Sequence, residues 1–182
     1  MEFSFSFEAK DDFLHQILEL QRKNLKINLS PLEVVNEGFV TLQYRFDVLK
    51  KMHEETPHLV VHTDGKVVGY ALAMPRHYGH IFPELNSMFQ TIDGELLKQL
   101  TAFSAEYLVM GQICIAKEFR GMGLFQQIYD VYLKKYKAQF GYVVTEIARM
   151  NARSLTVHKK VGFQEVATHT EDDGVEWIIC II

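Results

Sequence analysis

The sequence of 182 residues contains few of the residues that mark specialised protein classes. It has only two cysteines, Cys114 and Cys180, which lie far apart, each within an apolar run. This spacing excludes a disulfide framework and a zinc motif. No apolar stretch approaches the roughly 20 residues of a membrane span, and residues 1–10 lack the basic start and apolar run of a signal peptide. We therefore expect a cytoplasmic protein without a membrane partner.

Basic residues are also scarce. The 19 Lys and Arg are outnumbered by 23 Asp and Glu, which gives a net charge of -4 at pH 7. Proteins that bind nucleic acid normally carry a basic stripe. Here the densest basic groups, at 134–137 and 159–160, fall on predicted helices as solvated faces, so no nucleic-acid partner is expected. His77 and His80 have no further ligands near them in the sequence, so no metal site is expected either.

The length suits a single domain, and no repeat or linker divides the chain. In residues 1–58, local patterns predict a strand at 3–7 and a helix capped by Asp11 or Asp12. They also predict a helix after Ser30, with Glu33 completing a capping box, and a helix near Val48. In residues 59–182 they first predict a hairpin at 59–72 that turns at Asp64-Gly65, followed by helices near 84–90 and 95–103. A buried strand at 109–115, a helix and a strand at 142–148 come next. A helix from Asn151 to Gly162 and a closing hairpin of 164–168 with 175–182 complete the chain. This order indicates an α/β chain with a mixed sheet.

Two glycines lie between the buried strand and the next helix, in Phe119-Arg120-Gly121-Met122-Gly123-Leu124-Phe125. Glycines at these positions let the backbone turn so that several N–H groups face one point. The helix N-terminus adds partial positive charge, and Arg120 adds a formal charge. The segment therefore predicts a site for a phosphate or pyrophosphate.

Other nucleotide sites fit this loop less well. It is no P-loop, because no Lys followed by Ser or Thr ends it. A Rossmann fingerprint would need glycine at Gln126, and too few strand–helix steps follow, although Glu146 stands about 20 residues downstream as a ribose-binding acid would. A plain strand-to-helix turn that binds nothing is the remaining alternative.

Residues 113–125 resemble the acyl-CoA-binding motif of the GNAT acetyltransferase superfamily, a strand followed by Arg/Gln-x-x-Gly-x-Gly/Ala and a helix. Arg120 and Gly123 match the motif, whereas Phe125 replaces the last Gly or Ala. The resemblance implies acetyl-CoA as cosubstrate, with its pyrophosphate held by the backbone of Gly121, Met122, Gly123, Leu124 and Phe125. It further implies that the strand at Ile113, Cys114 and Ile115 pairs with the pantetheine arm through the backbone of Ile113 and Ile115.

A second segment, Asn151 to Phe163, resembles the other GNAT signature. Asn151, Ser154 and His158 are spaced to share one helix face. By resemblance, Asn151 and Ser154 meet the CoA arm, and His158 stands where the family usually has a tyrosine near the CoA sulfur. The implied fold is a mixed, mostly antiparallel central sheet flanked by helices and splayed at the cofactor strand. The implied domain spans 1–182, with a variable part at 1–58 and a core at 59–182.

The implied activity is transfer of an acetyl group to a primary amine of a small molecule or peptide by direct attack. His158 is the candidate proton donor to the thiolate, or it orients a water. Some family members place a glutamate early in the cofactor strand, but Val109 occupies that position here. Glu146 is then the candidate base, with a surface strand carboxylate as the plainer interpretation. Glu106 and Tyr107 are weaker candidates.

Several alternatives stay open. Cys114 could form an acyl-enzyme, although buried structural cysteine is commoner. The chain could bind acyl-CoA as a sensor or partner module without turnover. Transfer to aminoacyl-tRNA is disfavoured by the acidic balance. Family members often pair, so a homodimer is compatible with the resemblance.

Overall fold

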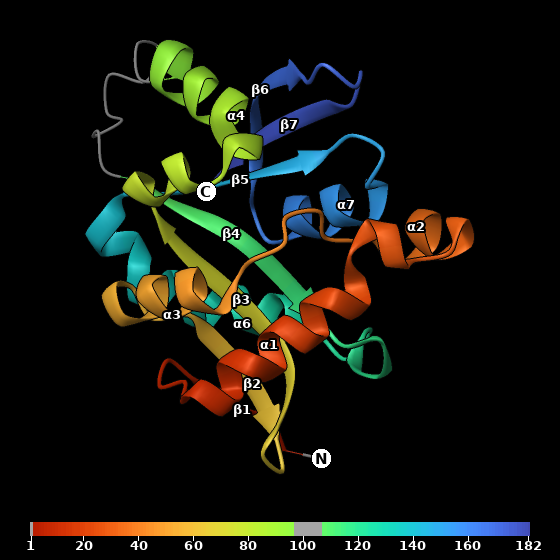
Figure 1. The fold of residues 1–182 in the computed structure, drawn as a ribbon, viewed down its shortest axis with the longest axis vertical. Helices are drawn as coiled ribbons and strands as arrows, with labels where there is room; N and C mark the ends of the chain where they lie inside the picture. The colour runs from red at the N-terminus through yellow and green to blue at the C-terminus, as the bar shows by residue number, and fades with distance from the viewer. Residues whose placement is uncertain (1, 97–106) are drawn as a thin grey trace.

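The computed structural model describes residues 2–96 and 107–182. Within these residues the chain forms a seven-stranded sheet with helices on both faces (Figure 1). The strands are β1 Ser4–Ser6, β2 Leu59–Thr63, β3 Lys66–Pro75, β4 Tyr107–Ile115, β5 Tyr142–Ala148, β6 Gln164–Thr170 and β7 Glu176–Ile181. The α-helices are α1 Asp11–Asn24, α2 Pro31–Glu37, α3 Phe46–Glu55, α4 Asn86–Thr91, α6 Leu124–Phe140 and α7 Ala152–Lys160. Short 3-10 turns occur at Lys26–Asn28, Arg76–Ile81, Pro83–Leu85 and Lys117–Phe119, and a π turn at Ile92–Leu96.

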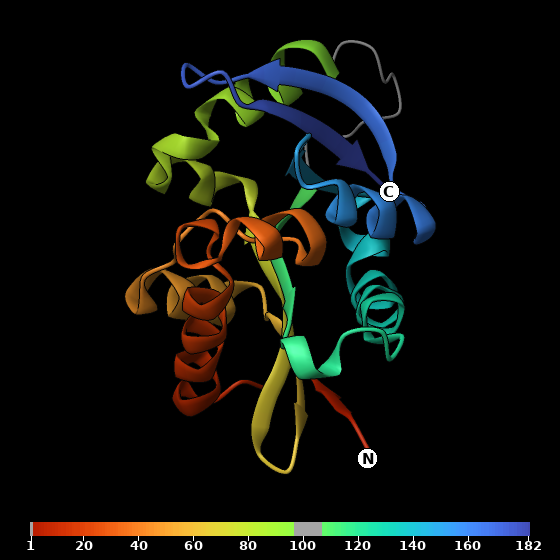
Figure 2. The same ribbon diagram turned by 90° about the vertical axis from the view of Figure 1, so that its right-hand side faces the viewer.

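The strand order is β1-β2-β3-β4-β5-β7-β6. Neighbouring strands are antiparallel except β4 and β5, which run parallel. α1 and α3 cover one face of the sheet, and α6 and α7 lie on the other (Figure 2). The predicted fold class, a mixed and mostly antiparallel sheet flanked by helices, is confirmed.

The sheet opens in its middle, between β4 and β5. Only Tyr107–Val109 pairs with Tyr142–Val144, although β4 runs on to Ile115 and β5 to Ala148. Beyond the paired residues the two strands diverge, and β4 keeps β3 alone as its partner (Figure 1). The predicted splay at this strand is therefore confirmed, and it leaves one edge of β4 open.

A bulge at Gly111 shapes the open part of β4. Leu72 pairs with Gln112 and Ala73 with Met110, so Gly111 is the extra residue. A Cβ at Gly111 would lie 2.5 Å from the hydroxyl of Tyr44. A side chain at residue 111 would therefore displace the tyrosine hydroxyl.

Buried hydrogen bonds fix the bulge against the helices that precede the sheet. Gln112 Oε1 accepts from Gln21 Nε2 at 2.9 Å and from Tyr70 Oη at 2.7 Å. Gln112 Nε2 donates to the Leu42 carbonyl at 2.8 Å, and Gln21 Oε1 accepts from the Tyr44 amide at 3.0 Å. β4 is therefore tied to α1 and to the loop before α3.

Local predictions had mixed outcomes. The hairpin turn at Asp64-Gly65 is confirmed, with φ of 49° and 75°. The capping box is also confirmed, since Ser30 and Glu33 satisfy each other's backbone amides. The prediction that Asp11 or Asp12 caps α1 is wrong. Lys10 occupies the N-cap without a side-chain bond, and both aspartates lie inside the first turn, where their charge suits the helix dipole.

The segment after β3 is broken up more than predicted. The helix expected near 84–90 is a 3-10 turn at Pro83–Leu85 followed by α4. The helix expected at 95–103 falls largely outside the described residues. The closing hairpin is confirmed, with β6 extending to Thr170.

Candidate functional site

A cavity of about 330 Å³ lies beside the open edge of β4, and we call it the loop cavity. Its walls are the glycine loop with the start of α6, the outer side of α7, and the segment that leaves α2. The lining residues are Asn24, Glu37, Gly38, Phe39, Val40, Ile113, Cys114, Ile115, Phe119, Arg120, Gly121, Gly123, Leu124, Phe125, Gln126, Arg153, Ser154, Val157, Lys160 and Val161. The two sequence motifs thus meet at one cavity. Met122, which the prediction also included, is exposed and is not among the lining residues.

The glycine loop presents free backbone amides to this cavity. Gly121 and Gly123 have φ of 78° and 77°, and Gly123 is the N-cap of α6 without a side-chain bond. Among the described residues, the first α6 amide with a backbone acceptor is that of Gln127, which bonds the Gly123 carbonyl. The amides at the start of a helix lack intrahelical partners and carry partial positive charge. The loop is therefore built as an anion site.

Arg120 does not point a free charge at this anion site. Its Nη1 donates to Glu37 Oε2 at 2.8 Å, Nη2 donates to Asn24 Oδ1 at 2.6 Å, and Nε donates to the Ile115 carbonyl at 3.1 Å. Its side chain is only 15% exposed. The formal charge expected at the phosphate site is therefore compensated by Glu37, whose pKa the arginine lowers.

The open edge of β4 provides the backbone groups that the resemblance implies. The Ala116 amide bonds the Val68 carbonyl of β3. Because amides alternate along a strand, those of Ile115 and Ile113 point away from β3, toward the gap. The Ile115 carbonyl is taken by Arg120, so Ile113 is the residue best placed to pair with an added strand.

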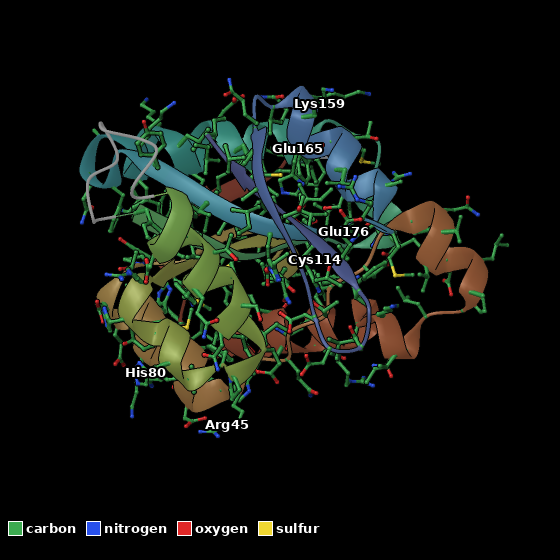
Figure 3. All side chains as sticks on the ribbon, turned by 90° about the horizontal axis from the view of Figure 1, so that it is seen from above. Arg45, His80, Cys114, Lys159, Glu165 and Glu176 are labelled. Carbon is green, nitrogen blue, oxygen red and sulfur yellow. The ribbon has the colours of Figure 1, made fainter. Side chains whose placement is uncertain are left out.

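Cys114 is an inert residue of this strand. It is buried and lies near the centre of the molecule in Figure 3, and burial raises the pKa of its thiol to about 12. A thiol with this pKa is protonated at neutral pH and is a poor nucleophile. The acyl-enzyme alternative therefore finds no support in the geometry.

Phe125 occupies space that Gly or Ala would leave empty. Its ring packs against those of Tyr129 and His158, with centroids 5.2 and 5.0 Å apart. Phe125, which lines the loop cavity, thereby belongs to an aromatic cluster between α6 and α7. The Phe125 backbone still belongs to the first turn of α6.

The polar residues of α7 are engaged within the protein. Asn151 is the N-cap: Oδ1 accepts from the Ser154 amide, and Nδ2 donates to the Phe39 carbonyl at 3.0 Å. His158 Nδ1 lies 2.8 Å from the Ser154 carbonyl and 3.2 Å from Ser154 Oγ. Asn151 therefore holds the segment that leaves α2, and Ser154 lies at the cavity wall.

The surroundings of His158 decide its protonation. A carbonyl only accepts hydrogen bonds, so the contact with Ser154 places the proton on Nδ1. Nε2 is buried and has no partner among the described residues. Burial lowers the His158 pKa to about 4, so the ring is neutral at pH 7. In this state Nε2 offers a lone pair, and His158 has no proton for a departing thiolate.

A second cavity of about 90 Å³ lies where β4 and β5 separate, and we call it the splay cavity. It shares Phe39, Val40, Ile113 and Ser154 with the loop cavity. Its other lining residues are Thr41, Leu42, Leu85, Met88, Val109, Met110, Gly111, Gln112, Thr145, Glu146, Ile147, Ala148, Asn151, His158 and Trp177. The two cavities therefore adjoin at the middle of β4.

Glu146 lies at the wall of the splay cavity and is not a surface carboxylate. Its side chain is 11% exposed, and Oε2 lies 2.9 Å from His169 Nε2 on β6. His169 Nδ1 lies 3.5 Å from Glu171 Oε1. Burial raises the Glu146 pKa, while the bond to Glu146 raises the His169 pKa. The imidazole between two carboxylates thus favours the imidazolium, which offsets part of the effect of burial on Glu146.

The remaining sequence candidates contribute little. Val109 lines the splay cavity without a polar group. Tyr107 lies at the paired end of β4, and its hydroxyl is 3.3 Å from Asp93 Oδ1. Glu106 lies outside the described residues. Within residues 2–96 and 107–182 there is no cluster of three potential metal ligands, and no helix there has the length and apolarity to cross a bilayer.

Three functional partners escaped the sequence reasoning. Glu37 and Asn24 hold Arg120 from more than 80 residues away, and His169 meets Glu146 only through the register of β5, β7 and β6. No motif contains these residues. No sequence signal links His169 to Glu146, because β7 lies between the two strands that carry them.

Comparisons with known proteins agree with this geometry. The model of the "Acetyltransferase (GNAT) family" matches residues 15–163. No curated protein matches the sequence significantly. A similar fold occurs in the ribosomal-protein-S18-alanine N-acetyltransferase of Escherichia coli, with a TM-score of 0.64 and 11% identity over 100% of this chain and 93% of that one. Another occurs in a putative acetyltransferase of Salmonella typhimurium with acetyl-CoA, with a TM-score of 0.64 and 15% identity over 100% of this chain and 94% of that one. A chain of the NatC complex bound to Gag peptide and CoA is also similar, with a TM-score of 0.67 and 12% identity over 100% of this chain and 98% of that one.

Proposed function

This chain belongs to the acetyltransferase (GNAT) family, and we propose that it transfers an acetyl group from acetyl-CoA to a primary amine of a small molecule or peptide by direct attack. The observation that carries the proposal is the junction of the two cavities. An anion site and an open strand edge line the loop cavity, and a buried carboxylate lines the splay cavity that adjoins it.

The residues of the loop cavity fit acetyl-CoA. The backbone amides from Gly121 to Phe125 would hold the pyrophosphate, as helix N-termini do. The open carbonyl of Ile113 would accept a hydrogen bond from the pantetheine arm. Arg153 and Lys160 also line this cavity and bring two positive charges to it. A neighbour of the same fold carries acetyl-CoA, which supports the assignment.

The splay cavity would hold the acceptor. A primary amine is protonated at neutral pH and must lose a proton before it can attack. Glu146 Oε1 makes no hydrogen bond to the described residues and so would accept that proton. The Ile113 amide, on the open edge of β4, would donate to the acyl oxygen as charge develops on it.

The bonds and protons balance in this scheme. Acetyl-CoA supplies an acyl carbon activated as a thioester. The N–C bond of the amide forms and the C–S bond breaks, so that one proton goes to Glu146 and the other leaves the nitrogen to solvent or thiolate. His158 Nε2, as an acceptor, would orient a water and would not donate directly.

The test is a thiol-release assay with acetyl-CoA over a panel of primary amines, run on wild type and Glu146→Gln. Wild type should release CoA with at least one amine class, and Glu146→Gln should lose about 100-fold in kcat/KM. Glu165→Gln, an exposed substitution on β6, is the control. The second candidate, an acyl-CoA-binding module without turnover, is favoured by the neutral state of His158. Binding of acetyl-CoA without thiol release from any amine would support it.

A further inference from the structure

The splay cavity has a single charged side chain, Glu146, among the described residues that line it. The rest of the wall is mostly apolar, with side chains such as Leu42, Met88, Ile147 and Trp177. In a wall of this kind an ion is poorly solvated and needs a direct partner of opposite charge. The described residues of the wall can therefore stabilise one positively charged group of a ligand and no negatively charged group.

The uncharged polar side chains of the wall are already hydrogen-bonded inside the protein. Gln112 binds the Leu42 carbonyl and accepts from Gln21 and Tyr70. Thr145 Oγ1 donates to the Met110 carbonyl at 3.2 Å. The Asn151 amide is held between the Ser154 amide and the Phe39 carbonyl. These uncharged side chains are therefore held in place by the protein itself, and none of them carries a charge to offer a ligand.

Two acceptor atoms on side chains of the wall make no hydrogen bond to the described residues. One is Glu146 Oε1, and the other is His158 Nε2. His169 Nε2, 2.9 Å from Glu146 Oε2, favours the ionised carboxylate, and Glu171 Oε1 lies 3.5 Å from the other ring nitrogen of His169. The wall thus recognises a donor with positive charge, which is what an ammonium group provides.

We propose that the acceptor is a primary amine on an uncharged, apolar body, and that amines with a carboxylate on the same short chain are rejected. This inference rests on the proposed function and narrows its substrate class. A carboxylate near the amine would enter beside Leu42 and Trp177 without a cationic partner. A second ammonium, as in a diamine, would find no second carboxylate in the wall.

The size of the cavity agrees with this class. Its volume is about 90 Å³, whereas an apolar cavity of about 150 Å³ holds benzene. The ammonium and a short aliphatic segment fit inside, and a larger body would extend past Thr41 to solvent. An N-terminal peptide amine with a small apolar first side chain belongs to the same class, because its carbonyl is uncharged.

The experiment compares amines that differ by one charged group. Isobutylamine is paired with valine, and butylamine with δ-aminovalerate and with putrescine. Binding to the acetyl-CoA-loaded protein is measured by ligand-observed NMR, and turnover by CoA release. Isobutylamine and butylamine should exceed their charged counterparts by roughly tenfold or more in affinity and in kcat/KM.

A charge introduced at the cavity mouth provides the matched variant. Thr41→Arg adds a cation at an exposed residue that lines the cavity, and Gln43→Arg adds one at an exposed residue that does not. Thr41→Arg should raise the affinity for valine relative to that for isobutylamine by roughly tenfold, and Gln43→Arg should leave this ratio of affinities unchanged.

Equal or stronger binding of valine or δ-aminovalerate by wild type would overturn the inference, even if acetyl transfer itself is observed. A preference for putrescine over butylamine would do the same. Absence of CoA release from every amine would count against the proposed function, and the binding ratios would still decide the acceptor class.

Discussion

Arg120 of the glycine loop is ion-paired with Glu37 at the end of α2, with Nη1 2.8 Å from Oε2. The pair joins segments 83 residues apart and places a carboxylate at the wall of the loop cavity, beside the amides proposed to hold a pyrophosphate. A carboxylate and a pyrophosphate that share one partly enclosed cavity repel each other. Glu37 should therefore weaken the binding of acetyl-CoA while it orders the loop.

The substitution Glu37→Gln tests this relationship. It keeps a side chain that can accept from Arg120 and removes the negative charge, so acetyl-CoA should bind about three- to tenfold more tightly at low salt. The gain should shrink as the salt concentration rises. Isothermal titration calorimetry at two salt concentrations measures both effects, with Glu19→Gln, an exposed acid on α1, as the control. Weaker binding by Glu37→Gln would show that the carboxylate is needed to position the loop.

Glu146 depends on His169 for its ionisation. Replacing His169 by Gln removes the imidazolium, so the Glu146 pKa should rise further above its ordinary value. A base must be deprotonated to act, and the acid limb of the kcat/KM profile should therefore move to higher pH. The profile is measured by CoA release from pH 5 to 9 with the best amine, and His62→Gln on β2 is the control. An unshifted acid limb would remove His169 from this role.

His158 makes stability depend on pH. Its folded-state pKa of about 4 lies below the ordinary value of 6.5, so the unfolded chain binds a proton that the folded chain does not between these values. The contribution is fully present above pH 6.5 and is lost as the pH falls toward 4. It amounts to on the order of 3 kcal/mol.

His158→Met fills the same aromatic cluster with a side chain that does not titrate. Urea unfolding at pH 7, 6 and 5 should show a smaller loss of stability with acid for the variant than for wild type. His58, whose pKa burial lowers to about 3, titrates in both proteins and leaves a common background. Parallel pH dependences for the two proteins would contradict the assignment.

Gly111 and Tyr44 should be energetically coupled. Gly111→Ala would place a methyl group 2.5 Å from the Tyr44 hydroxyl, which is buried and has no partner among the described residues. The clash should cost about 1–3 kcal/mol. Tyr44→Phe alone should be nearly neutral, because it removes a hydroxyl that makes no hydrogen bond there. In the double variant most of the loss should be recovered, and additive losses in denaturant unfolding would contradict the contact.

Features that depend on short stretches of chain could be predicted from the sequence. Asp64-Gly65, Ser30 with Glu33, and the glycines of the loop act through their own backbone torsions and nearest amides, so their spacing is informative. Features that depend on the pairing register of distant strands could not be predicted from the sequence. The burial of Glu146 requires β5 beside β7 and β7 beside β6, and the sequence-based choice of a surface carboxylate as the plainer interpretation was wrong for that reason.

The glycine loop and Arg120 show the same contrast between local features and features that depend on distant parts of the chain. Gly121 and Gly123 adopt positive φ because the turn itself requires it. The partner of Arg120, in contrast, is set by the path of α2, where the sequence carries no signal for a contact with the loop. The charge that Arg120 adds to a motif is therefore known only once Glu37 has been placed.

The most direct test of the account is the binding of acetyl-CoA to wild type, Gly123→Trp and Gly65→Trp by calorimetry. Gly123 and Gly65 share positive φ, 77° and 75°, and a side chain at either one meets open space or only the end of Gln127. The backbone strain of the two substitutions is thus matched, but only Gly123 lines the loop cavity. We expect wild type and Gly65→Trp to bind, and Gly123→Trp to lose at least about 30-fold in affinity through steric exclusion. Equal binding by all three proteins, or no binding by wild type, would contradict the placement of the cofactor in the loop cavity.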